Sequence, residues 1–239
     1  MFQTFIIQPI YNVFIYFIGV MPHGDVGLAI IALTLLMRAV FYPAFAASIR
    51  TQLGMQAIQE DIDEINKKYK DDPTEKGKRT MELFKEHRIR PFSSFLALLI
   101  QLPIFFALYY AFFREGLPKI AANLLYSFVS VPKVVNMEFF GLVNLRVAHN
   151  IPLTLLVAGL QYGVMWFSVA RIKSGSKKVS PERDAAQKTQ QQLMLYFFPA
   201  MMGVICFSLP AAVGVYFATT NLVSLGQEWL IRRQVGTKK

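Results

Sequence analysis

The chain has little cysteine and little charge. Of its 239 residues one is a cysteine, Cys206, three are histidines, and 17% are charged. A single cysteine excludes an internal disulfide, and the scattered histidines lack the spacing of a metal site. We find no carboxylate pair, no nucleophile beside a base and no phosphate-binding loop, so we expect no enzyme activity, no cofactor and no metal.

Hydrophobic residues make up 54% of the chain and gather in long runs. Runs of bilayer length indicate a membrane protein, since they override the soluble domains that length alone would suggest. Residues 1–25 predict an external helix, whose Pro9 and polar neighbours favour an interfacial position over a further span. We predict five spans, at 26–47, 92–113, 152–170, 193–208 and 210–231.

The basic residues predict the orientation of these spans. Twenty of the 25 Lys and Arg residues lie in segments 48–91, 171–192 and 232–239. By the positive-inside rule, these segments are a cytoplasmic hairpin, a cytoplasmic loop and a cytoplasmic tail. The N-terminus and the connection 114–151 are then external. Because the positive charges flank apolar runs, the net charge of +10 indicates contact with anionic lipid and gives no reason to expect nucleic acid.

Segment 48–91 predicts a hairpin of two helices. Its first half carries an apolar seam, and Asp72 and Pro73 suit the N-cap and first position of a second helix. A solvated charged loop is the alternative, but the seam favours the hairpin. The seam residues, spaced by three and four, are Met55, Ile58, Ile62, Ile65 and Tyr69.

Arg38 is the only charge in the predicted span 26–47. A guanidinium at such a depth costs at least about 2.5 kcal/mol, so it needs polar surroundings. Thr34 and Tyr42 lie one turn to either side of it on the same helix face. Polar residues also line faces of three other spans, and those that we assign with Arg38 to one groove are Gln101, Gln161, Asn221, Ser224 and Gln227.

Two alternatives compete with this groove. Each polar residue alone is explained as well by hydrogen bonding between helices. Four polar faces and an arginine are better explained by one shared cavity that water enters. Glu228 is the one acid within a span that is placed to neutralise Arg38; otherwise the cavity holds a net positive charge that attracts an acidic group.

Three blocks of sequence stand out when they are taken together and in order. They are LAIIALTLLMRAVFYP at 28–43, RPFSSFLALLIQLPIFFALYYAF at 90–112 and FFPAMMGVICFSLPAAVGVYFATTNLVSLGQEWLI at 197–231. In this order they resemble the YidC/Oxa/Albino-type membrane protein insertases. The resemblance implies an all-α membrane protein of five spans, with an N-terminal interfacial helix outside and a cytoplasmic helical hairpin. It also implies a hydrophilic groove open to the cytoplasm and the lipid, with its arginine at Arg38 and polar positions at Gln101 and Asn221.

The function that this resemblance implies is insertion of nascent membrane proteins into the lipid bilayer. The substrate would enter the groove and leave sideways into lipid without ATP. We expect a multi-pass protein of a bacterial-type cytoplasmic (inner) membrane, with the ribosome and a Sec translocon open as further partners. The alternatives are a small anion transporter or channel with Arg38 as its anion site, or an accessory assembly subunit of a Sec translocon.

Overall fold

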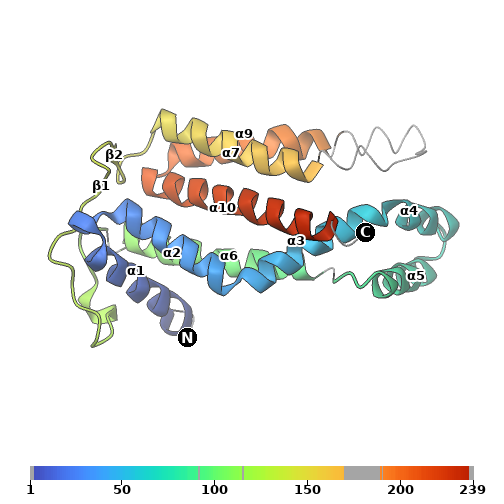
Figure 1. Ribbon diagram of the computed structural model, residues 1–239, viewed down its shortest axis with the longest axis horizontal. Coiled ribbons are helices and arrows are strands. Elements are labelled where there is room, and N and C mark those ends of the chain that lie inside the picture. The colour runs from blue at the N-terminus through green and yellow to red at the C-terminus, as the bar shows by residue number, and fades with distance from the viewer. Residues whose placement is uncertain (1–2, 91, 115, 170–188, 190, 237–239) are drawn as a thin grey trace.

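The protein is an elongated bundle of helices, seen side-on in Figure 1. This computed structural model describes residues 3–90, 92–114, 116–169, 189 and 191–236. Most of the predicted loop 171–192 lies outside the described residues. A pair of short helices lies at one end of the bundle, and a small β-hairpin lies at the other (Figure 1).

The N-terminal helix packs into the core. A short π-helix (Gln3–Ile7) leads into α1 (Gln8–Val20), and one face of α1 is fully buried. The buried Asn12 ties α1 to the following connection, because its Nδ2 donates to the carbonyl of Leu124 at 2.9 Å. Gln3–Val20 is long and apolar enough to cross a membrane. The interfacial position therefore stays a prediction, with a span as its alternative.

A bend divides the first predicted span. After a 3₁₀ turn (Pro22–Gly24), α2 (Val26–Val40) and α3 (Tyr42–Ala57) meet at an angle of 69°. Pro43 lies in the first turn of α3, where a residue without an N–H group is tolerated, whereas it would interrupt the hydrogen bonds of one continuous helix. Helix α3 continues for ten residues beyond Ala47, the predicted end of the membrane span.

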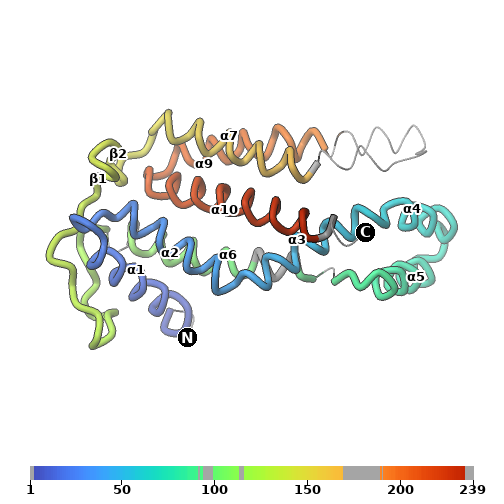
Figure 2. Tube along the Cα trace, in the orientation of Figure 1, coloured from blue at the N-terminus to red at the C-terminus, as the bar shows by residue number. Residues whose placement is uncertain are grey.

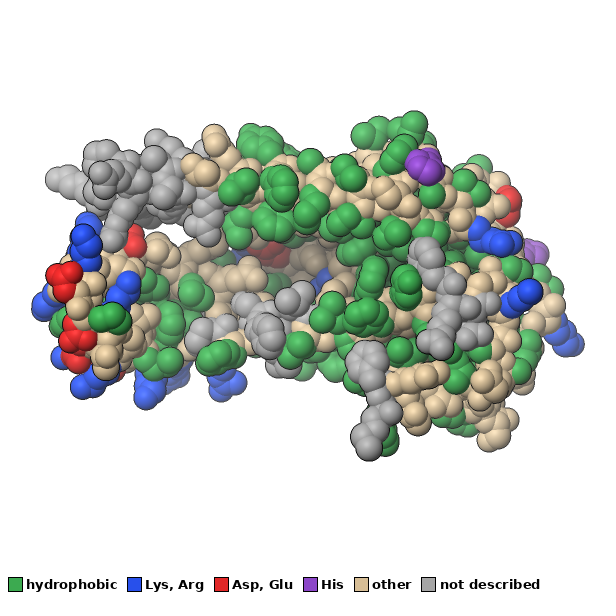
Figure 3. Space-filling model, turned by 180° about the vertical axis from the view of Figure 1, so that it is seen from behind, with side chains coloured by type: hydrophobic (Ala, Val, Ile, Leu, Met, Phe, Trp, Pro, Cys, Tyr) green, Lys and Arg blue, Asp and Glu red, His purple; other side chains and the backbone are tan. Residues whose placement is uncertain are grey.

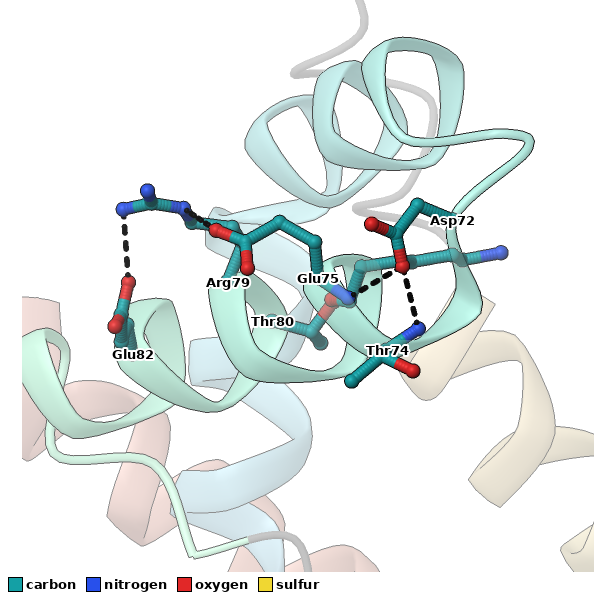
Figure 4. Close-up of polar contacts among 7 residues, drawn as sticks. Asp72, Thr74, Glu75, Arg79, Thr80 and Glu82 are labelled. Atoms are coloured by element: carbon teal, nitrogen blue, oxygen red, sulfur yellow. Dashed lines mark hydrogen bonds and ion pairs between the residues drawn. The ribbon is translucent and has the colours of Figure 1, made fainter.

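Two short helices lie within segment 48–91, where the sequence predicts a helical hairpin. Helices α4 (Gln59–Lys68) and α5 (Pro73–Glu86) pack against each other. Asp72 caps α5, and its Oδ1 accepts hydrogen bonds from the backbone N–H groups of Thr74 and Glu75, both at 3.0 Å (Figure 4). Further along α5, Arg79 pairs with Glu82 and Glu75, and the Glu82 carboxylate makes the largest contribution to its raised pKa.

The remaining helices form layers around α10 (Ala211–Gly236), which runs through the middle of the bundle (Figure 2). On one side lie α7 (Ile151–Val169) and α9 (Phe198–Ser208), the latter preceded by a π-helix (Leu193–Phe197). On the other side lie α2, α3 and α6 (Ser93–Tyr109), and α6 ends in a π-helix (Tyr110–Arg114). Helix α10 extends beyond the predicted boundary at Ile231.

The connection between α6 and α7 departs from the predicted all-α fold. It contains a 3₁₀ turn (Ala122–Leu124) and a hairpin of β1 (Glu138–Phe139) and β2 (Val143–Asn144), in which Phe139 pairs with Val143. The hairpin forms because Phe140 and Gly141 both take positive φ angles, the conformation of a tight reversal between strands. This end is part of the core, since Leu145 just after β2 is fully buried.

The fold is that of a mostly helical membrane protein. Among the described residues, Gln3–Val20 and Ile151–Ser168 are long and apolar enough to span a membrane, and α2 with α3 qualifies if the bent pair counts as one span. Leu99–Phe112 and Leu193–Ser208 are shorter apolar helices. Helix α10 is much less apolar because buried Thr220, Gln227 and Glu228 interrupt it.

A first prediction concerns the contact between α2 and the β-hairpin. A Cβ atom on Gly27 would lie 2.1 Å from Cδ2 of Phe139, so Gly27→Ala forces the ring to move. We expect this overpacking to destabilise the protein by about 1–3 kcal/mol and to lower its melting temperature in detergent. Gly159→Ala in α7 is the matched control, because open space surrounds that position. Equal melting temperatures for the two variants would contradict the contact.

A second prediction concerns the cap of α5. Asp72→Ala leaves the N–H groups of Thr74 and Glu75 without their carboxylate, which should cost about 0.5–2 kcal/mol of helix stability. Hydrogen exchange should therefore accelerate in the first turn of α5. Asp71→Ala, one residue earlier and outside the cap, should leave exchange unchanged; acceleration by both variants would show a general charge effect instead.

Candidate functional site

Arg38 lies in the last turn of α2 and is 8% exposed. Its guanidinium donates to three neutral groups of α10: the Ser224 hydroxyl at 2.9 Å, Gln227 Oε1 at 3.2 Å and the backbone carbonyl of Thr220 at 3.4 Å. Its Cζ atom also lies 4.2 Å from the ring centre of Phe45. The buried charge is therefore solvated by dipoles and an aromatic face.

The geometry of two elements places these partners. On α10 they follow one another at spacings of four and three, which puts them on one helix face. Phe45 reaches the guanidinium from α3, on the other side of the bend at Phe41. The site therefore depends on α2, α3 and α10 together.

Glu228 is paired elsewhere. Its Oε1 accepts a hydrogen bond from Arg232 Nε at 3.1 Å and another from Nη2 of the same side chain, and it also accepts from the Ser168 hydroxyl at 3.4 Å. Glu228 pairs with Arg232 because Arg232 follows it by four residues, on the same face of α10. In the part of the chain that the structure describes, no carboxylate forms an ion pair with Arg38. An Arg38–Glu228 pair, the alternative that the sequence left open, is thus not formed in this arrangement.

Among the described residues, no hydrogen bond joins the other predicted groove residues to Arg38. Gln101 on α6 donates to the hydroxyl of Tyr216 on α10, while Thr34 donates to its own helix at the carbonyl of Ile30, 2.7 Å away. Gln161 is half-buried on α7, and Tyr42 lies beyond the bend and is 37% exposed. Asn221 is buried, and its Nδ2 has no hydrogen-bond partner among the described residues.

Sequence reasoning missed three members of the site. Phe45 lies seven residues after Arg38 and inside the predicted span 26–47, but it was missed because only polar side chains were considered as partners of the guanidinium. The Tyr216 hydroxyl stands opposite Gln101, and a polar tip on an aromatic ring was a usable signal. The Thr220 carbonyl is a backbone group, which no side-chain pattern can mark.

The molecule is hollowed on the face opposite to Figure 1. Figure 3 shows a depression between the layer of α7 and α9 and the layer of α2, α3 and α6, with acidic and basic atoms at its floor. Apolar side chains line both rims. A hollow with a charged floor in an apolar wall favours entry of a polar segment beside a hydrophobic one.

The chemistry that this arrangement offers is that of a buried guanidinium with neutral partners. A guanidinium offers strong charge-assisted hydrogen bonds to a carboxylate, and its neutral partners can exchange for such a ligand. Among residues 3–90, 92–114, 116–169, 189 and 191–236, no group of three or more His, Cys, Asp or Glu side chains could hold a metal ion. The arrangement suits recognition of an acidic or carbonyl-bearing segment.

Comparison with known proteins places the chain in a family. The family model described as the 60Kd inner membrane protein matches residues 17–238. A membrane protein insertase YidC from Oceanobacillus iheyensis is 32% identical over 242 residues, which cover 99% of this chain and 86% of that protein.

Longer relatives match as well. A membrane protein insertase YidC from Francisella tularensis subsp. novicida is 30% identical over 214 residues, or 88% of this chain. The chain spans only 33% of the length of that relative and of its counterpart in subsp. tularensis. Because the family model covers nearly the whole chain, and the Oceanobacillus relative most of both sequences, this protein belongs to the 60Kd inner membrane protein family, that of the YidC/Oxa-type membrane proteins.

Proposed function

We propose that this protein is an insertase, which moves nascent membrane proteins into the bilayer through the hollow of Figure 3, and we assign Arg38 and its α10 partners to that hollow. One observation carries this proposal. Among the described residues, the hydrogen-bond partners of buried Arg38 are all neutral, while Glu228, the candidate for its counter-charge, is paired with Arg232. The site therefore holds an uncompensated positive charge that attracts an acidic group on a passing polypeptide.

Insertion follows from two surfaces that act together. An acidic or polar tail enters the hollow, where Arg38 and its α10 partners replace part of its hydration. The hydrophobic helix that follows lies against the apolar rims and leaves sideways into lipid. Because the hollow shortens the apolar distance that the polar segment must cross, it lowers the free-energy barrier to translocation of that segment. Burial of the substrate's own hydrophobic helix in lipid then drives insertion, so ATP is not needed.

The topology that supports this path has five spans, with the N-terminus outside and the C-terminus cytoplasmic. The charge asymmetry of the loops supports this orientation. The exposed apolar face of α7, where Leu155 is 67% exposed, supports contact with lipid beside the hollow. The bend at Phe41 supports the same picture, because it directs α3 toward the α4–α5 hairpin at the cytoplasmic end.

The α4–α5 hairpin is the proposed receiving surface for partners. A cavity of about 640 Å³ lies between its helices, with Ile65 and Leu83 among the apolar lining and Asp61, Glu64 and Glu86 among the acidic lining. Such a mixed surface suits transient contact with a targeting factor, the ribosome or a Sec translocon. The nascent membrane protein and the bilayer remain the partners on which the mechanism depends.

The role of Arg38 is tested by purified protein in liposomes. Arg38→Ala should reduce insertion of a substrate with an acidic tail by about ten-fold, because one charge-assisted hydrogen bond contributes about 1.5–3 kcal/mol. Arg38→Lys should retain more activity, and a substrate with a neutral tail should insert nearly as with the unaltered protein.

The substrate comparison separates recognition from misfolding. Arg50→Ala, at an exposed position of α3, is the matched control and should insert both substrates normally. Equal loss for both tails in Arg38→Ala would show a structural role alone. Anion flux through these liposomes without insertion would favour the transporter alternative.

Access of water to the hollow is tested with single cysteines after replacement of Cys206. Gln161→Cys and Gln101→Cys should react with a membrane-impermeant thiol reagent from the cytoplasmic side. Leu155→Cys, on the same helix as Gln161 but on its exposed apolar face, should stay unreactive because lipid covers it. If neither groove position reacts faster than position 155, the hydrophilic path is wrong.

A further inference from the structure

The turn of the β-hairpin contains Phe140 in a backbone conformation with positive φ, which is unfavourable for an aromatic residue. Phe140 has φ +51° and Gly141 has φ +69°, and the N–H of Leu142 donates to the carbonyl of Phe139 at 3.0 Å. These are the features of a type I′ turn, whose two central positions favour asparagine, aspartate or glycine. A bulky side chain at positive φ is strained, so its presence needs a reason outside the turn itself.

Packing inside the protein supplies only part of that reason, since the Phe140 ring contacts the neighbouring Phe139 ring, with 4.6 Å between the ring centres. The Phe140 side chain is 64% exposed, and Leu142 on the other side of the turn is 86% exposed. Phe139 behaves differently, since it is half-buried and lies against Gly27 of α2. The tip therefore presents two large apolar side chains outward while the base of the hairpin packs inward.

The tip is held firmly to the bundle. The N–H of Phe140 donates to Asp25 Oδ2 at 3.1 Å, and the other oxygen of Asp25 caps α2 by accepting from the N–H of Leu28 at 3.0 Å. Beyond β2, the carbonyl of Leu145 accepts from the N–H of Ala212 at the start of α10, at 3.1 Å. The hairpin is thus fixed to the ends of two core helices.

The exposed apolar surface continues from this tip onto a candidate span. Val147 is 58% exposed on the segment that leads from β2 to α7, and Ile151 at the start of α7 is 60% exposed. Helix α7 is long and apolar enough to cross the bilayer, and only 6% of its stretch Ile151–Ser168 is buried inside the protein. Figure 1 shows the hairpin beside this end of α7, so the lipid that covers α7 reaches the level of the tip.

We propose that the β1–β2 tip is an interfacial anchor, in which Phe140 and Leu142 insert into the headgroup–acyl boundary of the leaflet at this end of the bundle. Aromatic side chains favour this zone, and such anchors set the depth and tilt of the helices attached to them. Through Asp25 and Leu145 the anchor sets the depth of α2 and α10, and hence of Arg38. The proposal requires a membrane location and does not rest on insertase activity.

Depth measurement tests the anchor directly. The two native tryptophans, Trp166 and Trp229, are replaced by phenylalanine, and Leu142→Trp supplies the probe in full-length protein. In phosphatidylcholine–phosphatidylglycerol vesicles we expect blue-shifted emission and quenching by lipids brominated near the headgroup. The matched control is Glu138→Trp at the exposed base of the hairpin, which should emit as in water. Equal quenching of the two probes, or none at position 142, would overturn the proposal.

A second variant separates the anchor from the fold. Phe140→Asn suits the positive φ, so the melting temperature in detergent should stay the same or rise. In vesicles the same change should reduce quenching of the Leu142→Trp probe, because the aromatic side chain no longer enters the boundary. Unchanged quenching would overturn the anchor, as would a crosslink showing that position 142 contacts a second copy of the chain instead of lipid.

Discussion

The arrangement of the bundle depends on the burial of Arg38, whose hydrogen-bond partners within the described part of the chain are all neutral. A guanidinium among apolar helices must find several acceptors, and α10 supplies a hydroxyl, an amide oxygen and a backbone carbonyl on one face. Those acceptors fix the register of α2 against α10. They also make α10 too polar to lie alone in lipid, and so it lies in the middle of the bundle between the other helices.

The site was predictable where side-chain spacing carries the information. Ser224 and Gln227 share a helix face, and the structure brings both to Arg38. The pairing of Glu228 was also visible in principle, because Arg232 follows it by four residues. The hydrogen bond from Thr34 to the carbonyl of Ile30 in its own helix was not predictable. A threonine hydroxyl in a helix can donate to the preceding turn as readily as to a neighbouring helix, and the sequence does not distinguish the two.

The fold was predictable in its apolar runs and less so at its breaks. A proline inside a run, such as Pro43, marks either a kink within one span or the first turn of a new helix, and tertiary packing decides between them. The β-hairpin escaped prediction for a related reason. Its turn carries Phe140 where an asparagine would have signalled a reversal, so the local sequence contradicts the conformation that Asp25 and the α10 end impose.

In the proposed mechanism, the neutral partners of Arg38 affect how readily the site takes up and releases the acidic group of a substrate. A buried ion pair is expensive to break, because removal of one partner leaves an uncompensated charge that costs about 3–5 kcal/mol. If Glu228 held Arg38, each arriving carboxylate would have to displace it; since Arg232 holds Glu228, the guanidinium exchanges only dipoles for the incoming charge. The same neutral shell accepts the guanidinium again when the substrate leaves. In the proposed mechanism, a site that binds passing chains needs this reversibility more than it needs affinity, and the i,i+4 pair of Glu228 and Arg232 on α10 supports it.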